Sequence, residues 1–163
     1  MIGGAGTGSL PLDRVTVSSV VARCSRAMAS AQAGVMTGPV RVMVVDDQPS
    51  FLRAAARSLA ADPALDVVRA VASASAAFTA LEEGIEVDIA LIDLSMPEMS
   101  GVEAIAWIHR SYPDIVSVLM STYEPDELPA SARSLDVAYL RKADVSAERV
   151  VALARAGSPP KRP

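Results

Sequence analysis

Apolar runs alternate with helix-like segments along the chain from Pro39 onwards. Each run is four to seven residues long and rich in Val, Ile and Leu, and short, mostly apolar runs of this kind predict buried strands. The predicted strands are Val40–Val45, Leu65–Val71, Val87–Ile92, Ile115–Met120 and Val137–Leu140.

Between the runs, apolar side chains recur every three or four residues, which is the spacing of one helix face. Gly84 is the expected C-terminal cap of the second helix, and Ser146 is the expected N-cap of the last. The fourth helix contains Pro129, so we expect it to be the weakest. The predicted helices are Pro49–Ala61, Ser73–Leu81, Gly101–Ser111, Asp126–Ser134 and Ser146–Ala156.

Five strand–helix repeats predict an α/β fold with a doubly wound five-stranded parallel sheet of the (βα)5 type. Sites in such folds lie outside the carboxyl ends of the strands, where the strand order reverses. We therefore expect the polar residues that follow strand ends to form one site. They are Asp46, Asp47, Asp93, Ser121 and Lys142.

Three carboxylates at strand ends suit a hard divalent cation such as Mg²⁺, which prefers oxygen ligands. Without a cation they repel one another, and the pKa of at least one rises. Asp93 is a candidate nucleophile that forms an acyl phosphate, and the turn at Met96-Pro97 can present the Ser95 backbone carbonyl to the cation. The alternative for Asp46 and Asp47 is that they cap the next helix.

The other two polar strand ends suit a phosphoryl group. The Ser121 hydroxyl can donate to a phosphoryl oxygen, and the Lys142 ammonium can pair first with Asp93 and then with the phosphoryl group. An ordinary turn serine and a solvated surface lysine are the alternatives. Tyr139 is a candidate rotameric switch, and strand alternation places it on the same face as Arg141.

Composition narrows the classes of partner. Residues 39–157 hold 18 acidic and 10 basic side chains, so this part lacks the basic surface that binding to nucleic acid requires. Cys24 is the only cysteine, and no apolar stretch approaches the roughly 20 residues that cross a bilayer, so we expect a cytoplasmic protein without a membrane segment. Residues 1–38 are expected to form a disordered N-terminal extension and residues 158–163 a disordered tail, with Met36 an alternative natural start.

The motifs at the strand ends resemble those of a response regulator receiver domain over residues 39–156. The segment Gln48–Val71 is similar to the NarL-type subgroup. The resemblance implies a flavodoxin-like strand order, 2-1-3-4-5. The motifs that carry it are Val44-Val45-Asp46-Asp47, Leu91-Ile92-Asp93-Leu94-Ser95-Met96-Pro97 with Gly101, Leu119-Met120-Ser121-Thr122 and Ala138-Tyr139-Leu140-Arg141-Lys142.

The resemblance also implies a phosphoacceptor and its cofactor. Asp93 would accept a phosphoryl group from a phosphohistidine on a partner sensor histidine kinase. Asp47, Asp93 and the Ser95 backbone carbonyl would bind Mg²⁺, with Asp46 assisting through water. Such a protein is a phosphoacceptor with slow autodephosphorylation and not an enzyme in the ordinary sense.

A switch is implied as well. Ser121 and Lys142 would hold the phosphoryl oxygens, and movement of Ser121 would let Tyr139 turn inward. The surface made by the last two predicted helices and the last strand would then change. That surface would bind an unknown downstream protein or a second copy of the chain, giving a homodimer.

Three residues depart from the usual pattern of the family. Ala143 follows Lys142 where proline is frequent, so we do not expect a cis peptide there. Thr122 stands where alanine is frequent, and we expect it to narrow access to the site. Ser95 replaces residues that tune dephosphorylation, which leaves the lifetime of the phosphorylated state open.

Only seven residues follow Ala156, too few for the helix-turn-helix that NarL-type members usually carry. We therefore expect a stand-alone receiver that signals through a protein. A degenerate receiver that only binds partners, or a phosphate sink in a phosphorelay, are the alternatives.

An enzyme of the haloacid dehalogenase type is disfavoured because Gln48 stands where its second aspartate belongs. A flavin-binding protein is disfavoured because Asp46 and Asp47 would repel its phosphate.

Overall fold

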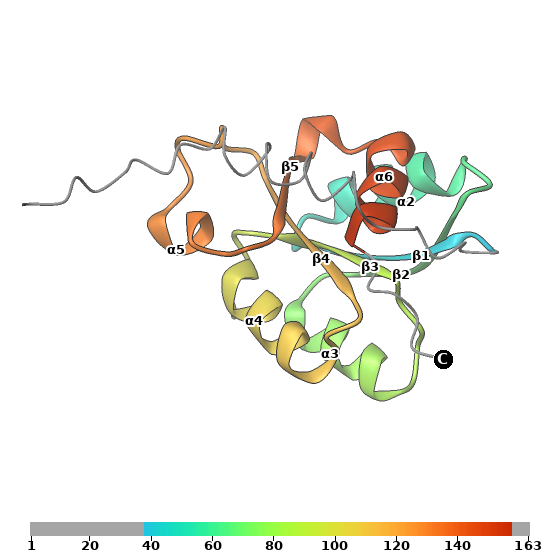
Figure 1. Ribbon diagram of the computed structural model, residues 1–163, viewed down its shortest axis with the longest axis horizontal. Coiled ribbons are helices and arrows are strands. Elements are labelled where there is room, and N and C mark those ends of the chain that lie inside the picture. The colour runs from blue at the N-terminus through green and yellow to red at the C-terminus, as the bar shows by residue number, and fades with distance from the viewer. Residues whose placement is uncertain (1–37, 158–163) are drawn as a thin grey trace, which may run out of the picture.

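Five parallel strands form one sheet in the order β2-β1-β3-β4-β5, as Figure 1 shows, and the predicted fold class is confirmed. This computed structural model describes residues 38–157, so Cys24, Met36, the predicted tail and nearly all of the predicted extension lie outside it. Every strand begins and ends within two residues of its predicted bounds. The strands are β1 (Val40–Val45), β2 (Leu65–Val71), β3 (Ile89–Asp93), β4 (Val116–Ser121) and β5 (Ala138–Arg141).

Helices cover both faces of the sheet (Figure 1). On one face lie α3 (Ala74–Glu82) and α4 (Gly101–Ser111), and on the other lie α2 (Pro49–Ala60) and α6 (Ala147–Gly157). A short helix, α5 (Ala130–Arg133), follows β4, and a 3₁₀ turn over Lys142–Asp144 follows β5. Each layer of helices buries one side of the sheet.

The middle strand β3 is buried along its whole length. Ala90 and Ile92 face α3 and α4, whereas Ile89 and Leu91 face α2 and α6. Strands β1 and β4 both pair with β3 in parallel. Because the core packs against both sides of β3, the carboxyl end of the strand is rigid and holds Asp93 in a fixed position.

Capping residues fix the ends of the helices. Gly84 has a φ of +88°, and its N–H donates to the Leu81 carbonyl, so the predicted cap of α3 is confirmed. Ser100 and Glu103 form a reciprocal capping box at the start of α4. Ser146 directly precedes α6, as predicted for its N-cap.

The fourth predicted helix is much shorter than expected. The sequence predicts a helix over Asp126–Ser134, whereas α5 spans only Ala130–Arg133. Pro129 has an extended ψ of 152° and precedes the helix, because a proline ring disfavours helical backbone at the residue before it. The residues ahead of it form a turn in which the Glu127 N–H donates to the Glu124 carbonyl at 3.0 Å.

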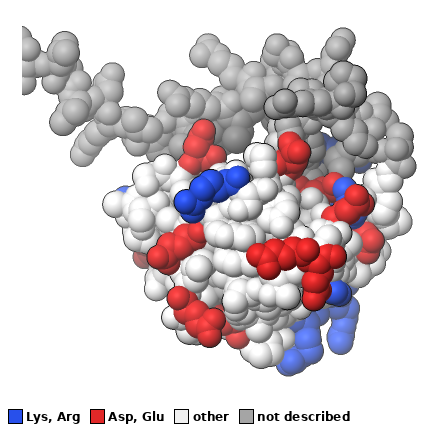
Figure 2. Space-filling view, turned by 90° about the horizontal axis from the view of Figure 1, so that it is seen from below, with Lys and Arg blue, Asp and Glu red and all other residues white. Residues whose placement is uncertain are grey.

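The face that carries α3 and α4 has more acidic than basic side chains (Figure 2). The acidic side chains lie around a largely uncharged central area. This distribution agrees with the excess of 18 acidic over 10 basic residues in the range 39–157. Within the described range, no helix combines the length and the apolar character that crossing a bilayer requires.

Candidate functional site

Three carboxylates meet where β1 and β3 end. Asp46 and Asp47 follow β1, and Asp93 is the last residue of β3. One oxygen from each lies within 4.8 Å of the others. Asp46 and Asp93 are buried, and Asp47 is partly exposed. The structure therefore brings together the acids that the strand pattern predicts to be neighbours.

Backbone groups fix the orientation of Asp46. Its Oδ1 accepts the Gln48 N–H at 2.9 Å, and its own N–H donates to the Val71 carbonyl at 3.1 Å. Gln48 is the N-cap residue of α2 and makes no side-chain cap. Neither Asp46 nor Asp47 therefore takes the N-cap position, and both stay at the strand end.

Lys142 bridges two of the acids. Its Nζ lies 2.7 Å from Asp46 Oδ2 and 3.2 Å from Asp93 Oδ2, and its side chain is only 7% exposed. Burial alone lowers the pKa of Lys142, but the hydrogen bond to Asp46 and the charge of Asp93 outweigh it, so the pKa is raised. The ammonium therefore stays charged, and the alternative of a solvated surface lysine is wrong.

Asp93 is a buried carboxylate close to a second buried carboxylate, Asp46. Burial raises the pKa of Asp93, the Lys142 charge opposes that rise, and the Asp46 charge adds to it. A perturbed pKa beside a specific charged partner is typical of a reactive carboxyl. The arrangement favours Asp93 as the nucleophile among the three acids.

The loop after Asp93 depends on close backbone packing at Gly101. A Cβ on Gly101 would overlap the Asp93 carbonyl oxygen and lie 3.0 Å from Leu119 Cδ1. The Gly101 N–H donates to the Leu94 carbonyl at 3.0 Å, and the Leu94 N–H donates to the Met120 carbonyl at 2.8 Å. These contacts seat the start of α4 directly on the strand end that carries Asp93.

A hydrogen-bonded chain joins Ser121 to Tyr139 through one loop residue. Ser121 Oγ accepts the Tyr123 N–H at 3.2 Å, and the Tyr139 hydroxyl donates to the Tyr123 carbonyl at 2.5 Å. Burial raises the pKa of Tyr139, and the nearby Ser121 hydroxyl opposes that rise. The two predicted switch residues are therefore connected through Tyr123.

A second residue of β5 holds the same loop. Arg141 pairs with Glu124, and its Nε donates to Asp144 Oδ2 at 2.8 Å. Tyr139 and Arg141 thus both reach the loop from β5. The loop between β4 and α5 is tied to β5 at Tyr123 and at Glu124.

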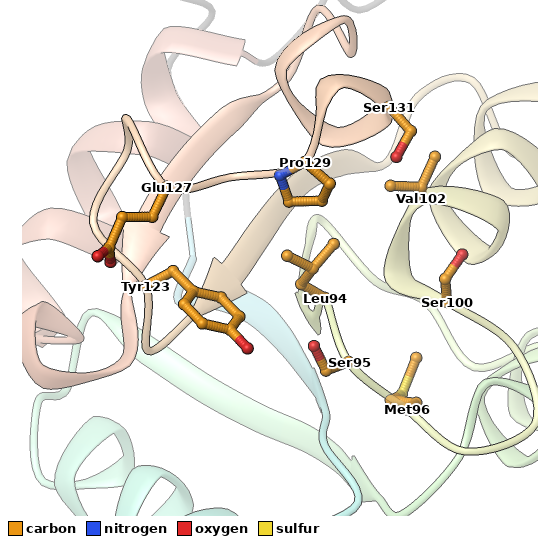
Figure 3. A pocket seen from close by; sticks show the side chains of 9 residues that line it. All are labelled: Leu94, Ser95, Met96, Ser100, Val102, Tyr123, Glu127, Pro129 and Ser131. Atoms are coloured by element: carbon orange, nitrogen blue, oxygen red, sulfur yellow. The ribbon is translucent and has the colours of Figure 1, made fainter.

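Two hollows flank the loop Leu94–Met99. The larger has a volume of about 600 Å³, with Tyr123 on one wall and Val102 of α4 on the opposite wall (Figure 3). The smaller has a volume of about 130 Å³ and borders Asp47. Tyr123 is 49% exposed and is the only large hydrophobic side chain among residues 38–157 that is exposed. The loop next to Asp93 is accessible from both sides.

The family of the chain follows from comparison with known proteins. Residues 42–152 match the response regulator receiver domain, and the chain belongs to that family. Its acidic triad is typical of the Mg²⁺ site of receiver domains, and three carboxylates with oxygens this close suit that hard cation.

Individual proteins agree with this assignment. Response regulator GacA of Pseudomonas viridiflava is 33% identical over 115 residues, which are 70% of this chain and 53% of GacA. The protein-glutamate methylesterase/protein-glutamine glutaminase 1 of Rhodospirillum rubrum is 35% identical over 85 residues, which are 52% of this chain and 22% of that protein. The signal receiver domain of NarL from Mycobacterium tuberculosis has 29% identity and a TM-score of 0.59, covering 72% of this chain and 97% of that domain.

The chain spans about half the length of GacA and about a quarter of the length of the methylesterase relatives. The methylesterases are similar over their receiver region only. A receiver domain is generally a phosphoacceptor rather than an enzyme.

Sequence reasoning missed part of the surroundings of Lys142. It predicts pairing with Asp93, whereas the shorter contact is to Asp46. The predicted helix Pro49–Ala61 also gives Phe51 no role at the site, whereas the centroid of its ring lies 5.1 Å from the Lys142 Nζ. Phe51 lies in the first helical turn after Asp46-Asp47, and this position in the sequence could have predicted that its ring lies near the site. The shorter contact depends on side-chain rotamers, which the sequence pattern does not specify.

Proposed function

We propose that Asp93 accepts a phosphoryl group from the phosphohistidine of a sensor histidine kinase in a Mg²⁺-dependent reaction. The observation that carries this proposal is the buried Lys142 ammonium, which touches both Asp46 and Asp93. A fixed positive charge beside the attacking carboxylate stabilises the charge that develops on a transferring phosphoryl group.

In the proposed reaction, an Asp93 carboxylate oxygen attacks phosphorus. The new O–P bond forms as the P–N bond breaks, and the imidazole leaves with the electron pair and takes up a proton. Lys142 and the Ser121 hydroxyl would then hold phosphoryl oxygens. Mg²⁺, when bound by Asp47, Asp93 and the Ser95 carbonyl with Asp46 assisting through water, supplies neutralising charge.

The phosphorylated state would be read at the surface near Tyr139. A move of the Ser121 hydroxyl toward the phosphoryl group would remove the acceptor of the Tyr123 N–H, and so loosen the chain that leads to Tyr139. Tyr139 would turn inward and reshape the surface of α5, β5 and α6. A downstream protein, or a second copy of the chain, would bind that surface in the cytoplasm.

Within the family, we place the chain in the NarL-type subgroup. The similarity to the NarL receiver domain and to GacA supports that placement. Histidine kinases are the general partners of receiver domains, and phosphotransfer profiling against a set of kinases would identify the specific one.

The test is covalent labelling of the purified full chain with Mg²⁺ and acetyl phosphate, followed by intact mass spectrometry. We expect the wild type to gain one phosphoryl group that hydroxylamine removes, and Asp93→Asn to gain none. Asp66→Asn, an exposed position on β2, is the matched control and should label like the wild type. An unlabelled wild type would indicate a degenerate receiver, and a labelled Asp93→Asn would move the acceptor to another residue.

A further inference from the structure

Besides its two acids, the Lys142 ammonium faces one neutral group. Its Nζ lies 5.1 Å from the centroid of the Phe51 ring. That distance is within the roughly 6 Å at which a cation is attracted to the negative face of an aromatic ring. Because the Lys142 side chain is 7% exposed, water does not screen this attraction strongly.

The position of the Phe51 ring is set by apolar packing. Phe51 lies in the first turn of α2, which begins three residues after Asp46, and this places the ring beside the strand end. Ala55 and Leu59 continue the same helix face and are buried in the core cluster against which Phe51 packs. The ring is therefore held by the core and does not depend on the charges of the site.

The partners of Lys142 respond differently when the site is used. Asp46 and Asp93 would share their charge with a cation or a phosphoryl group, so their attraction for the ammonium would fall. The Phe51 ring has no charge to share and no oxygen to offer a cation. Its attraction for Lys142 is the one that stays constant as the ligands of the acids change.

We infer that Phe51 is a positioning residue for Lys142, and that its ring face holds the ammonium at the strand end where a phosphoryl oxygen arrives. The inference rests on the proposed function, because it gives Lys142 a task in phosphoryl transfer. Phe51 acts only through Lys142 and touches none of the reacting atoms.

The first test compares initial rates of labelling with acetyl phosphate. Phe51→Leu keeps an apolar side chain but removes the ring face, and we expect labelling to slow by roughly tenfold, or about 1.4 kcal/mol in the barrier. Phe51→Tyr keeps the face and should label within about twofold of the wild type. Phe78→Leu is the matched control, since Phe78 stacks on Trp107 on the opposite side of the sheet, and its rate should not change.

A second test separates positioning from a general effect on folding. Fluorinated phenylalanines at position 51 keep the shape of the ring but make its face progressively less negative, so the rate should fall step by step. In a Lys142→Ala background, Phe51→Leu should have no further effect. Equal rates across the fluorinated series, or a full further loss in the Lys142→Ala background, would overturn the inference.

A third measurement needs no phosphorylation. The ring current of Phe51 should shift the NMR signals of the Lys142 side-chain protons next to Nζ, and Phe51→Leu should abolish that shift. If the wild type is not labelled, the proposed function fails. If the wild type shows no ring-current shift, Phe51 does not contact Lys142 and the inference fails. If the wild type is labelled and Phe51→Leu labels at the same rate, the inference fails while the proposed function stands.

Discussion

At the scale of single residues, burial of two acids at the strand ends lowers the stability of the fold but suits a reactive site. Asp93 is 3% exposed and lies beside Asp46, which is fully buried, with one ammonium shared between them. Removing one of two buried like charges leaves a neutral pair, which is cheaper to bury than a net charge. The residue that serves the proposed chemistry is therefore one that the fold does not need.

We expect Asp93→Asn to stabilise the protein in Mg²⁺-free solution by roughly 1–2 kcal/mol at pH 7. Because burial raises the pKa of Asp93, the ionised group costs stability at neutral pH. That cost shrinks as the pH falls below the raised pKa and is gone below the ordinary pKa of about 3.9, where the carboxyl is protonated in both the folded and the unfolded chain. Urea unfolding at several pH values measures the difference, and an advantage that persists at about pH 3 would point to packing instead of charge.

A second residue-scale prediction concerns Ser117 on β4. Its side chain is buried, and its Oγ has no hydrogen-bond partner among residues 38–157. Ser117→Ala should therefore stabilise the domain by about 0.5–1 kcal/mol, because a buried unpaired hydroxyl is lost and no bond is broken. Thermal unfolding tests this, and a lower melting temperature would show that the hydroxyl is bonded.

The residue types of the site could be predicted from the sequence, whereas their contacts could not. Asp46, Asp93 and Lys142 end apolar strands, and the parallel sheet alone is enough to bring them to one edge. The closer approach of Lys142 to Asp46, and the ring of Phe51 beside it, depend on rotamers in a packed site. Strand and helix periodicity carries no information on rotamers.

At the scale of elements, the site depends on how α4 meets β3. Gly101→Ala should destabilise the domain by about 1–3 kcal/mol, because the new Cβ overlaps the Asp93 carbonyl and helix and strand must separate. We also expect slower labelling of Asp93. Gly84→Ala is the matched control: its φ of +88° makes it cost about 1 kcal/mol through backbone strain, yet it lies away from the site and should label normally. Urea unfolding followed by Trp107 fluorescence measures the stability of both variants. Equal labelling rates for the two variants would contradict the prediction.

The loop between β4 and α5 gives another prediction. Glu124→Gln removes the ion pair with Arg141 but leaves the Tyr139 hydrogen bond to the loop. Both members of the pair are substantially exposed, so global stability should change by less than about 1 kcal/mol. Hydrogen exchange of residues 122–129 should become faster, since fewer contacts hold them. Unchanged exchange there would mean that Tyr139 alone restrains the loop.

Element boundaries show where sequence patterns stop being informative. The apolar run predicts that β3 starts at Val87, but the Asp88 carboxylate takes the Arg41 N–H at 2.8 Å and also binds the Arg41 guanidinium. Regular pairing therefore begins at Ile89. Pro129 similarly shortens α5 by a backbone effect that helix periodicity does not register.

At the scale of the whole molecule, the fold class follows from alternation alone, and the strand order follows from the resemblance to receiver domains. Three of the 18 acidic side chains in residues 39–157 meet at the site, which makes it the expected place for a cation. A ligand that binds only the folded state stabilises it, by about 2.7 kcal/mol at a concentration 100 times its Kd.

We therefore expect Mg²⁺ to raise the melting temperature of the wild type and to have little effect on Asp47→Asn or Asp93→Asn. Asp66→Asn should respond like the wild type, because Asp66 lies outside the acidic triad. NaCl of equal ionic strength corrects for general screening. An equal response in all four proteins would place the cation elsewhere.

The short connection from Ser121 through Tyr123 to Tyr139 has a consequence for timing. Side-chain rotations and loop movements of this size take nanoseconds to microseconds, whereas phosphoryl transfer by kinases runs at roughly 1–100 per second. The loop would thus sample its conformations many times in the interval that one phosphoryl transfer takes. A partner would meet an equilibrium mixture, and the strength of the signal would depend on how far phosphorylation shifts that mixture.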